Sequence, residues 1–439
     1  MDVKSMNECL LAGTINREGM WPRLEELERK AVSFRFSFGL DALPIEPGVI
    51  VVRGPRQYGK STWLDLELRH TIVEHGPGSA LYLNGDDLIN ERDLEEQLLT
   101  LEQLFPARTT VRRIFIDEIT AVPEWERAMK RLWDRGNLRR TLIVTTGSRA
   151  TDLRRGSEKL PGRKGRLPQT EFVFLPIAYR EFAAKGREVL GDETWLAYLL
   201  AGGSPLALND LYQLGRLPEY LIQMTRDWIL GEVVSSGRSR IFLAALTQNL
   251  FRFGGTPCGY AKLARESGLA NNTVASGYIE QLGDLLCVLP AWKWEERGVL
   301  NLRVPCKFHF INLLAAVSLF HGPLRRVDDM KALDPEVQAM FLEWIVAQEI
   351  WRRAVLRTPA ETEALGFWKS KTHEIDFVTP EGELVEVKRG QANASEFAWF
   401  HKVFPKKRLT VICATPFETD FVCGVTIEDY LLAGPGPKG

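Results

Sequence analysis

The clearest chemical signature in the sequence lies at residues 54–61, which have the spacing G-x-x-x-x-G-K-[ST]. This spacing is typical of a loop that binds nucleotide phosphates, because its two glycines allow a sharp turn that directs backbone N–H groups at phosphate oxygens. We expect Lys60 to contact the β- and γ-phosphates and the Ser61 hydroxyl to hold Mg²⁺. The predicted ATP contacts are Gly54, Pro55, Arg56, Gln57, Tyr58, Gly59, Lys60, Ser61 and Thr62.

The segments on either side of this loop support that interpretation. Residues 49–52 are apolar and stand between glycines, which predicts a buried strand. Residues 62–74 mix Trp and Leu with charged residues, which favours a helix. A helix that begins at the loop adds a partial positive charge where the phosphates would lie. The alternative is an ordinary glycine-containing turn, and the acidic motif further along the chain argues against it.

That acidic motif follows a short apolar run, because residues 113–118 read Arg-Ile-Phe-Ile-Asp-Glu. We predict a strand whose end places Asp117 in the Mg²⁺ shell and Glu118 beside the attacking water. A solvated strand end is the alternative. Residues 141–148 are predicted to form another strand that ends in hydroxyls, so either Thr146 or Ser148 could reach the γ-phosphate or the water.

A basic, turn-forming segment at residues 160–166 carries Arg163 and Arg166. An arginine on such a loop could reach a nucleotide held by a neighbouring subunit and neutralise transition-state charge. We therefore predict this role for Arg163 or Arg166 in a homo-oligomer. A solvated basic turn fits the same residues equally well.

A second set of charged residues lies near the C-terminus. Asp376 and the Glu386-x-Lys388 sequence fall on two predicted strands of a hairpin and resemble the PD-(D/E)XK nuclease motif. Glu386 and Lys388 point to the same side, because alternate residues of a strand share a face. Asp376 and Glu386 are predicted to bind Mg²⁺ with a water molecule. Lys388 could orient that water or neutralise charge on the phosphorane.

The preceding helix, predicted at residues 336–353, supplies a third carboxylate to this set. We expect Glu343, or in its place Glu349, to complete the metal site. Two alternatives remain open. The hairpin charges could be an ordinary surface pair, or the domain could keep the nuclease-like fold for binding or docking without cleavage.

The middle of the chain has the pattern of a helix-turn-helix. Helices are predicted at residues 241–253, 259–268 and 271–282, with Asn271 as an N-cap. Residues 285–290 and 291–295 would then form a wing. A recognition helix would present Asn271, Asn272 and Thr273 to DNA. The helix has few Lys and Arg residues, so a winged helix used only for packing is an equal alternative.

Composition limits the remaining possibilities. The chain has 439 residues, 45% hydrophobic and 26% charged, with a net charge of −1. This length favours two or three domains, and the balanced charge restricts any nucleic-acid surface to a local patch. The six cysteines lack CxxC spacing, which argues against a zinc site and for a reducing cytoplasm. No signal-like N-terminus and no apolar run of about 18 residues is present, so we expect a cytoplasmic protein without a membrane segment.

Several motifs occur in a characteristic order: the loop at 54–61, the Ile-Asp-Glu strand, the Thr-Gly-Ser strand, a Tyr-Arg-Glu-Phe stretch and a Gly-Gly-x-Pro turn. Together they resemble the prokaryotic AAA-type ATPases that carry a C-terminal DUF4143 domain. The resemblance implies an α/β fold with a P-loop NTPase parallel sheet, a helical and winged-helix segment, and a restriction-endonuclease-like C-terminal domain. The predicted divisions are a lead-in (1–45), ATPase core (46–185), helical lid (186–235), winged-helix-like segment (236–304) and nuclease-like domain (305–433).

Three functions are compatible with these features. The first is an ATPase that uses ATP and Mg²⁺ and is coupled to DNA binding or processing by a nuclease-like domain. The second is an ATP-regulated switch or interaction module whose nuclease-like domain is non-catalytic. The third is a scaffold with a degenerate nucleotide site, and the intact Lys60, Ser61, Asp117 and Glu118 argue against it.

Overall fold

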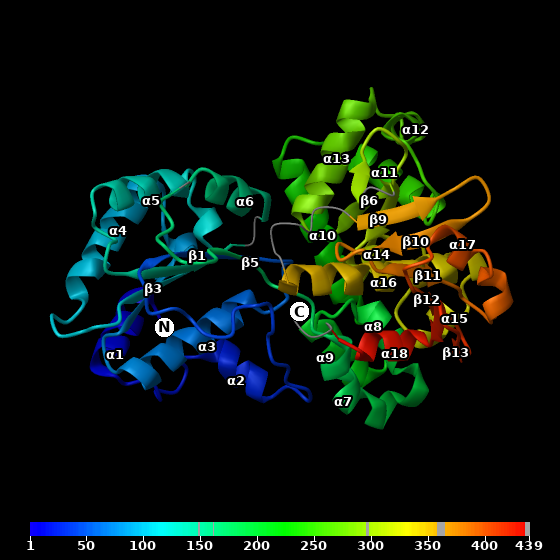
Figure 1. Cartoon of the computed structure of the whole chain (residues 1–439). Helices are drawn as coiled ribbons and strands as arrows, with labels where there is room; N and C mark the ends of the chain where they lie inside the picture. Colours follow the sequence, from blue (N-terminus) through cyan, green and yellow to red (C-terminus); the bar gives the residue numbers. More distant parts are fainter. Residues whose placement is uncertain (148–149, 161, 296–297, 358–364, 435–439) are drawn as a thin grey trace. The chain divides into compact units, whose positions relative to one another are not determined.

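The computed structural model describes residues 1–147, 150–160, 162–295, 298–357 and 365–434, and the chain divides into two compact units. Unit 1 is Met1–Leu175 and unit 2 is Pro176–Gly439 (Figure 1). Each unit has its own sheet, and each is described separately below. Among the described residues, no helix combines the length and the apolar character needed to cross a bilayer.

Unit 1 is built on a parallel five-stranded sheet in the order β2-β3-β4-β1-β5. The strands are β1 (Gly48–Arg53), β2 (Ala80–Asn84), β3 (Arg113–Asp117), β4 (Leu142–Thr146) and β5 (Glu171–Val173). The three strands predicted at residues 49–52, 113–118 and 141–148 are thus confirmed as β1, β3 and β4, to within one or two residues at each end. In a parallel sheet of this kind, the carboxyl ends of the strands and the loops that follow them gather at one edge.

Helices cover both faces of this sheet (Figure 1). They are α1 (Val3–Ala12), α2 (Pro22–Glu28), α3 (Lys60–His75), α4 (Glu91–Leu104), α5 (Trp125–Asp134) and α6 (Ala150–Glu158). Val49 and Val51 of β1 belong to a buried core with α4 and α5. Because side chains alternate along a strand, the intervening Ile50 and Val52 point to the other face. Asn7 of α1 pairs with the free edge of β2: its side-chain amide donates to the Tyr82 carbonyl and accepts from the Tyr82 N–H.

The first half of unit 2 is helical. Its helices are α7 (Tyr179–Leu190), α8 (Thr194–Ala201), α9 (Pro205–Leu214), α10 (Glu219–Ser235), α11 (Arg240–Arg252), α12 (Tyr260–Glu266) and α13 (Asn272–Asp284). The predicted helix-turn-helix pattern is present as α12 and α13, and the Asn271 side chain caps α13 by accepting from the Val274 N–H at 3.0 Å. Between α8 and α9 the chain turns through Gly202 and Gly203, both at positive φ.

The second half of unit 2 contains a mixed nine-stranded sheet. Its strands are β6 (Val288–Glu295), β7 (Val299–Asn301), β8 (Lys307–Phe310), β9 (Leu365–Lys369), β10 (Glu374–Val378), β11 (Leu384–Val387), β12 (Leu409–Ile412), β13 (Phe417–Glu418) and β14 (Val422–Val425). The remaining helices are α14 (Leu313–Leu319), α15 (Val327–Lys331), α16 (Pro335–Arg357), α17 (Phe400–Val403) and α18 (Ile427–Leu432). The predicted hairpin is present, because β10 and β11 pair antiparallel.

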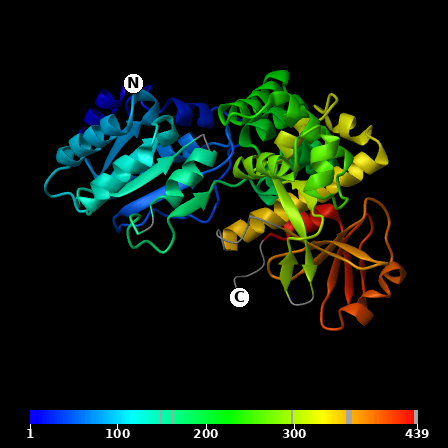
Figure 2. The same ribbon diagram turned by 90° about the horizontal axis from the view of Figure 1, so that it is seen from above.

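The wing differs from the sequence prediction. Residues 285–290 and 291–295 do not form two strands, because β6 runs without a break through Pro290. The hairpin partner of β6 is β7, and β6 also pairs in parallel with β9 of the C-terminal sheet. Figure 2 shows this yellow-green hairpin beside the orange strands. One sheet therefore crosses the predicted division at 304/305, and the five-part division of the chain stays a prediction.

Candidate functional site

The loop between β1 and α3 has the backbone of a phosphate cradle. Gln57 and Gly59 adopt positive φ values of 65° and 98°, so the chain curls tightly before α3 begins at Lys60. The loop glycines also allow close packing. A Cβ at Gly54 would lie 2.6 Å from Phe174, and one at Gly59 would lie 2.9 Å from Phe36. Both positions therefore require glycine for space, and Gly59 also requires it for its positive φ.

Lys60 is buried in this loop, and the structure gives it carbonyl partners. Its Nζ donates hydrogen bonds to the Gly54 carbonyl at 2.9 Å and to the Pro55 carbonyl at 2.8 Å. Burial lowers the pKa of the Lys60 ammonium to about 8, despite the opposing charges of Glu118 and Asp117. A desolvated ammonium in a curled loop is suited to bind a phosphate anion. The loop therefore fits the triphosphate of ATP.

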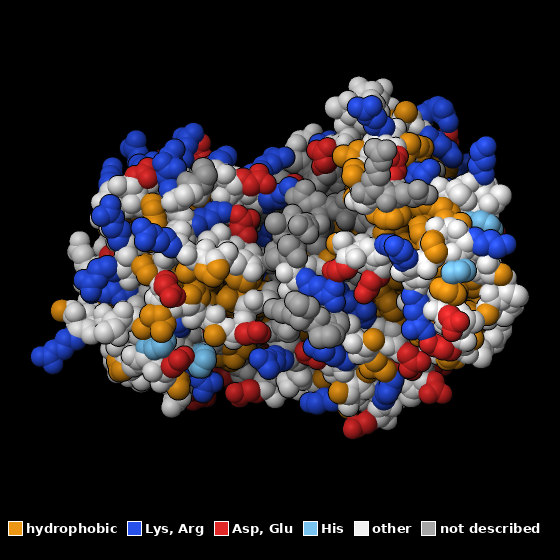
Figure 3. Space-filling model, in the orientation of Figure 1, with side chains coloured by type: hydrophobic (Ala, Val, Ile, Leu, Met, Phe, Trp, Pro, Cys, Tyr) orange, Lys and Arg blue, Asp and Glu red, His pale blue; other side chains and the backbone are white. Residues whose placement is uncertain are grey.

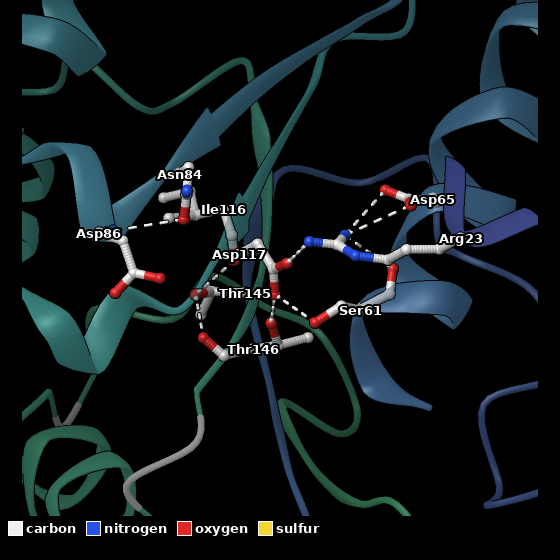
Figure 4. Close-up of polar contacts among 9 residues, drawn as sticks. All are labelled: Arg23, Ser61, Asp65, Asn84, Asp86, Ile116, Asp117, Thr145 and Thr146. Carbon is white, nitrogen blue, oxygen red and sulfur yellow. Dashed lines mark hydrogen bonds and ion pairs between the residues drawn. The ribbon is translucent and has the colours of Figure 1, made fainter. Parts of the chain in front are cut away.

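Asp117 is the hub of the polar contacts at the end of β3 (Figure 4). Its Oδ1 accepts hydrogen bonds from Ser61 Oγ at 3.0 Å and from Thr146 Oγ1 at 2.6 Å. The structure thus brings together three residues that the sequence places on separate elements. Mg²⁺ prefers oxygen ligands, so a hydroxyl and a carboxylate beside the phosphate loop fit this ion. Ser148, the other predicted hydroxyl, lies outside the described residues.

Arg23 of α2 completes this cluster, and the sequence gives no indication of it. Its Nη2 lies 3.0 Å from Asp117 Oδ2, and its Nη1 lies 3.3 Å from Asp65 of α3. Burial raises the pKa of Asp65 to about 6, and the guanidinium opposes that rise. The Arg23 side chain is 41% exposed. The aspartate that is predicted to bind Mg²⁺ is therefore paired with a cation that solvent can reach.

Glu118 follows β3 in a left-handed conformation, with φ of 52°. Such a backbone is unusual for a residue other than glycine, and strain of this kind is concentrated at functional sites. The neighbouring chain is tightly fitted, because a Cβ at Gly85 would lie 2.2 Å from the Glu118 carbonyl oxygen. Glu118 is half-buried beside the Asp117 cluster. Its role toward the attacking water stays a prediction.

The two arginines predicted to act on a neighbouring subunit lie away from this cluster. Arg163 Nε forms an ion pair with Asp134 Oδ1, at the end of α5, over 2.8 Å. Arg166 is exposed. The predicted role of either arginine in another subunit stays a prediction.

In unit 2, the hairpin of β10 and β11 brings its predicted charged residues together. Asp376 Oδ2 accepts from the Val387 N–H at 3.0 Å, and Glu386 Oε2 accepts from the Asp376 N–H at 3.2 Å. Lys388 Nζ lies 2.6 Å from Glu386 Oε1. Burial, followed by the charge of Asp376, raises the pKa of Glu386 to about 7. Two buried carboxylates and one partly exposed lysine therefore form a compact set.

Glu343, rather than Glu349, is the helix residue that joins this set. Burial, followed by the charge of Asp376, raises the pKa of Glu343 to about 8. Its Oε2 is buried without a hydrogen-bond partner among the described residues. Glu349 instead binds Arg352 and Arg353 at 2.7–2.9 Å, so its charge is neutralised inside α16.

Lys307 of β8 is a further member of this site that the sequence prediction omits. Its Nζ lies 3.0 Å from Asp376 Oδ1 and 2.7 Å from Glu374 Oε1, and its side chain is 1% exposed. A lysine at the start of the apolar run at 307–311 was a signal for it, because a buried lysine needs carboxylate partners.

A divalent metal does not fit the C-terminal site with its side chains in this arrangement. Each oxygen of Asp376 and Glu386 already has a lysine or backbone N–H beside it. In the part of the chain that the structure describes, no group of three or more His, Cys, Asp or Glu residues is placed to hold a metal ion. The predicted metal roles of Glu343, Asp376 and Glu386 therefore stay predictions.

Residues 46–183 match the family model described as an AAA domain. This segment is a P-loop ATPase domain of the AAA type. The match covers the phosphate loop, Asp117 with its partners Ser61 and Thr146, and the arginines Arg163 and Arg166, whereas Arg23 lies outside it. The parallel sheet of unit 1 agrees with it. The C-terminal DUF4143 assignment stays a prediction, and no curated protein matches the chain.

Several solved structures are weakly similar. RuvB of Thermotoga maritima is 16% identical with a TM-score of 0.31, over 58% of this chain and 85% of that chain. A Walker-type ATPase of Pyrococcus abyssi is 15% identical with a TM-score of 0.41, over 62% and 90%. The Aeropyrum pernix ORC1 protein in complex with DNA is 16% identical with a TM-score of 0.32, over 62% and 86%. TM-scores this low carry no argument about function.

Proposed function

We propose that this protein binds ATP with Mg²⁺ and hydrolyses it at the phosphate loop of unit 1. The observation that carries the proposal is the joint contact of Ser61 and Thr146 with Asp117 Oδ1, beside the loop that holds the buried Lys60. Lys60 would bind the phosphates, and Ser61 and Asp117 would hold Mg²⁺. The bound ion would neutralise charge on the β- and γ-phosphate oxygens. Glu118 would polarise the attacking water.

Two variants test this proposal with different readouts. Glu118→Gln keeps the shape of the side chain but removes the carboxylate, so we expect ATP to bind and turnover to fall by about 100-fold or more. Lys60→Ala should lose binding itself, measured with a fluorescent ATP analogue. A Glu118→Gln enzyme with wild-type turnover would remove Glu118 from its role. Wild-type protein that neither binds nor hydrolyses ATP would end the proposal.

A second proposal concerns the partner of this ATPase. Glu343, Asp376, Glu386 and Lys388 converge on one site of a hairpin-containing sheet, which supports a nuclease-like domain that binds or processes DNA. The alternative is a non-catalytic interaction module, and the lysine contact on Asp376 favours it. ATP turnover should be measured with and without single-stranded, duplex and junction DNA. A change in turnover with one of these DNAs would show coupling to DNA, and equal turnover with all of them would show none. A plasmid cleavage assay with Asp376→Ala as control separates cutting from binding.

The surface at α13 is the proposed contact region for that partner. A cavity of about 460 Å³ lies at this helix and is lined by Arg238, Tyr260, Asn272, Thr273, Ser276, Gly277 and Glu280. Polar groups at a helix N-terminus are the kind that contact phosphates. On the face shown in Figure 3, basic side chains are interspersed with acidic ones, so a DNA surface would be local. Thr273→Glu should weaken DNA binding if α13 faces the nucleic acid, and unchanged affinity would remove α13 from the interface.

The proposed homo-oligomer also has a direct test. If Arg163 acts on the nucleotide of a neighbouring subunit, turnover should rise with protein concentration and fall in Arg163→Ala. Mixing Arg163→Ala with Lys60→Ala should then restore part of the activity, because each variant supplies what the other lacks. A fully active wild-type monomer would contradict this role.

A further inference from the structure

The carboxylate site of unit 2 contains a cation of its own. Lys307 stands at the start of β8, and its Nζ lies within 3.0 Å of both Asp376 and Glu374. The same ammonium lies 5.6 Å from the centre of the Phe367 ring. Burying a charged group is costly unless it is paired, and here the pairing is with two carboxylates at once. The sheet therefore holds Lys307 in place as part of its fold.

Every carboxylate oxygen of Asp376 and Glu386 has a donor beside it. Lys307 contacts Asp376 Oδ1, and the Val387 N–H contacts Asp376 Oδ2. Lys388 contacts Glu386 Oε1, and the Asp376 N–H contacts Glu386 Oε2. Each of the four oxygens of Asp376 and Glu386 thus faces a donor of the protein, whereas Oε2 of the neighbouring Glu343 has no hydrogen-bond partner among the described residues.

A divalent ion at this site would meet two obstacles. It would have to take Asp376 Oδ1 from Lys307, whose side chain is 1% exposed and cannot turn out to solvent without opening the sheet. It would also lie close to an ammonium group, and like charges repel strongly where water is excluded. Lys388 differs in this respect, because its side chain is 41% exposed and can move.

We propose that Lys307 is the resident cation of the nuclease-like site and takes the place of a divalent metal ion. Lys307 neutralises Asp376 and Glu374, holds β8 against β10, and leaves the site unable to take Mg²⁺ or Mn²⁺. The C-terminal domain then engages its partner without metal-dependent cleavage. This inference rests on the nuclease-like assignment of the domain and is independent of ATP hydrolysis in unit 1.

The test uses full-length, nucleotide-free protein and two lysine variants. Lys307→Met removes the buried ammonium. Lys369→Met is the matched control, because Lys369 also contacts Glu374, at 2.5 Å, but is 47% exposed. We expect wild type and Lys369→Met to have the same unfolding temperature with and without millimolar Mn²⁺. Lys307→Met should unfold several degrees lower, and Mn²⁺ should restore most of the loss. Adding Asp376→Asn should abolish that restoration.

Direct calorimetric titration with Mn²⁺ keeps the proposal falsifiable if Lys307→Met does not fold. Wild type and Lys307→Arg should show no Mn²⁺ binding that depends on Asp376. Binding to wild type that Asp376→Asn abolishes would overturn the proposal, and so would a Lys307→Met protein as stable as wild type and indifferent to Mn²⁺. Neither readout involves ATP, so a failure here is distinguishable from a failure of the ATPase proposal.

Discussion

The nucleotide site of unit 1 and the carboxylate site of unit 2 both pair a central aspartate with a cation, and they differ in how far that cation is buried. In each, a cation from outside the sequence motif lies 3.0 Å from the central aspartate: Arg23 on Asp117, and Lys307 on Asp376. The Arg23 side chain is 41% exposed, whereas that of Lys307 is 1% exposed. An exposed pair contributes about 0–1 kcal/mol, whereas breaking a buried pair costs about 3–5 kcal/mol, and the Arg23–Asp117 pair, with an exposed cation and a buried carboxylate, lies between these limits. We therefore expect the first cation to give way to a ligand and the second to remain as part of the fold.

The lysines of the two motifs differ in a related way. Lys60 Nζ donates to two neutral backbone carbonyls, at 2.8 and 2.9 Å. Lys388 is paired with Glu386 at 2.6 Å. The charge of Lys60 is therefore available to an incoming anion, whereas much of the charge of Lys388 is already used. This comparison favours ligand binding in unit 1 and internal neutralisation in unit 2.

The largest expected effect separates the two aspartates. Asp117→Asn should lower kcat/KM for ATP by about 100-fold or more, because the substitution removes charge at the predicted Mg²⁺ site. Asp376→Asn should leave ATP turnover within about twofold, because unit 2 has no predicted part in the chemistry. The assay is steady-state phosphate release with saturating Mg²⁺. Equal losses in both variants would break the comparison.

A backbone change at the nucleotide site should have the next largest effect. Gly85→Ala would place a Cβ 2.2 Å from the Glu118 carbonyl oxygen, so Glu118 must move. We expect kcat to fall by about tenfold, since a shift of about 1 Å can cost that much or more. Gly231→Ala is the control, because its Cβ meets nothing within 4 Å. Unchanged kcat in Gly85→Ala would show that the position of Glu118 is unimportant.

Removing the exposed cation should have a modest, ligand-dependent effect. Arg23→Gln leaves the buried carboxylates of Asp65 and Asp117 without their shared partner, so the nucleotide-free protein should lose about 1–3 kcal/mol of stability, between the values for an exposed and a buried pair. Saturating Mg²⁺ and a non-hydrolysable ATP analogue should reduce that difference, because the ion replaces the guanidinium. Urea unfolding with and without the ligand measures both quantities. A loss as large with ligand as without it would make Arg23 a structural cation like Lys307.

The smallest effects concern pH, and they have opposite signs in the two sites. The pKa of Glu343 is raised from 4.5 to about 8, so the folded state binds a proton that the unfolded state lacks in this window. Stability should therefore decline as pH rises through it, and Glu343→Gln should flatten the decline. The pKa of Lys60 is lowered from 10.5 to about 8, so between these two pH values the unfolded state binds more protons and the contribution of Lys60 to stability rises with pH. The free energy of unfolding measured from pH 6 to 9 checks the decline predicted for Glu343. A decline with pH as steep in Glu343→Gln as in wild type would contradict this prediction.

The motif residues could be predicted from the sequence because their signals are local. The loop at 54–61, the Asp117-Glu118 pair and the hairpin of Asp376 and Glu386 each depend on short spacings within one or two elements. The choice between Glu343 and Glu349 could not be made in this way. Six residues on a helix correspond to about 600°, so the two side chains lie about 120° apart around the axis and only one can face the site. Sequence alone does not say which one.

Arg23 and Lys307 could not be assigned for a different reason. Their contacts are set by how distant segments pack, and 69 residues separate Lys307 from Asp376 in the chain. The bounds of the wing were missed for the same reason, because β6 (Val288–Glu295) is one strand that pairs with β7, β8 and the distant β9. Long-range pairing, rather than composition or periodicity, thus decides which cation each aspartate meets.

Counting bound Mn²⁺ in the presence of a non-hydrolysable ATP analogue tests the central comparison most directly. The account predicts one Mn²⁺ per chain, lost in Asp117→Asn and kept in Asp376→Asn. Two ions per chain, or a single ion that Asp376→Asn removes, would contradict it.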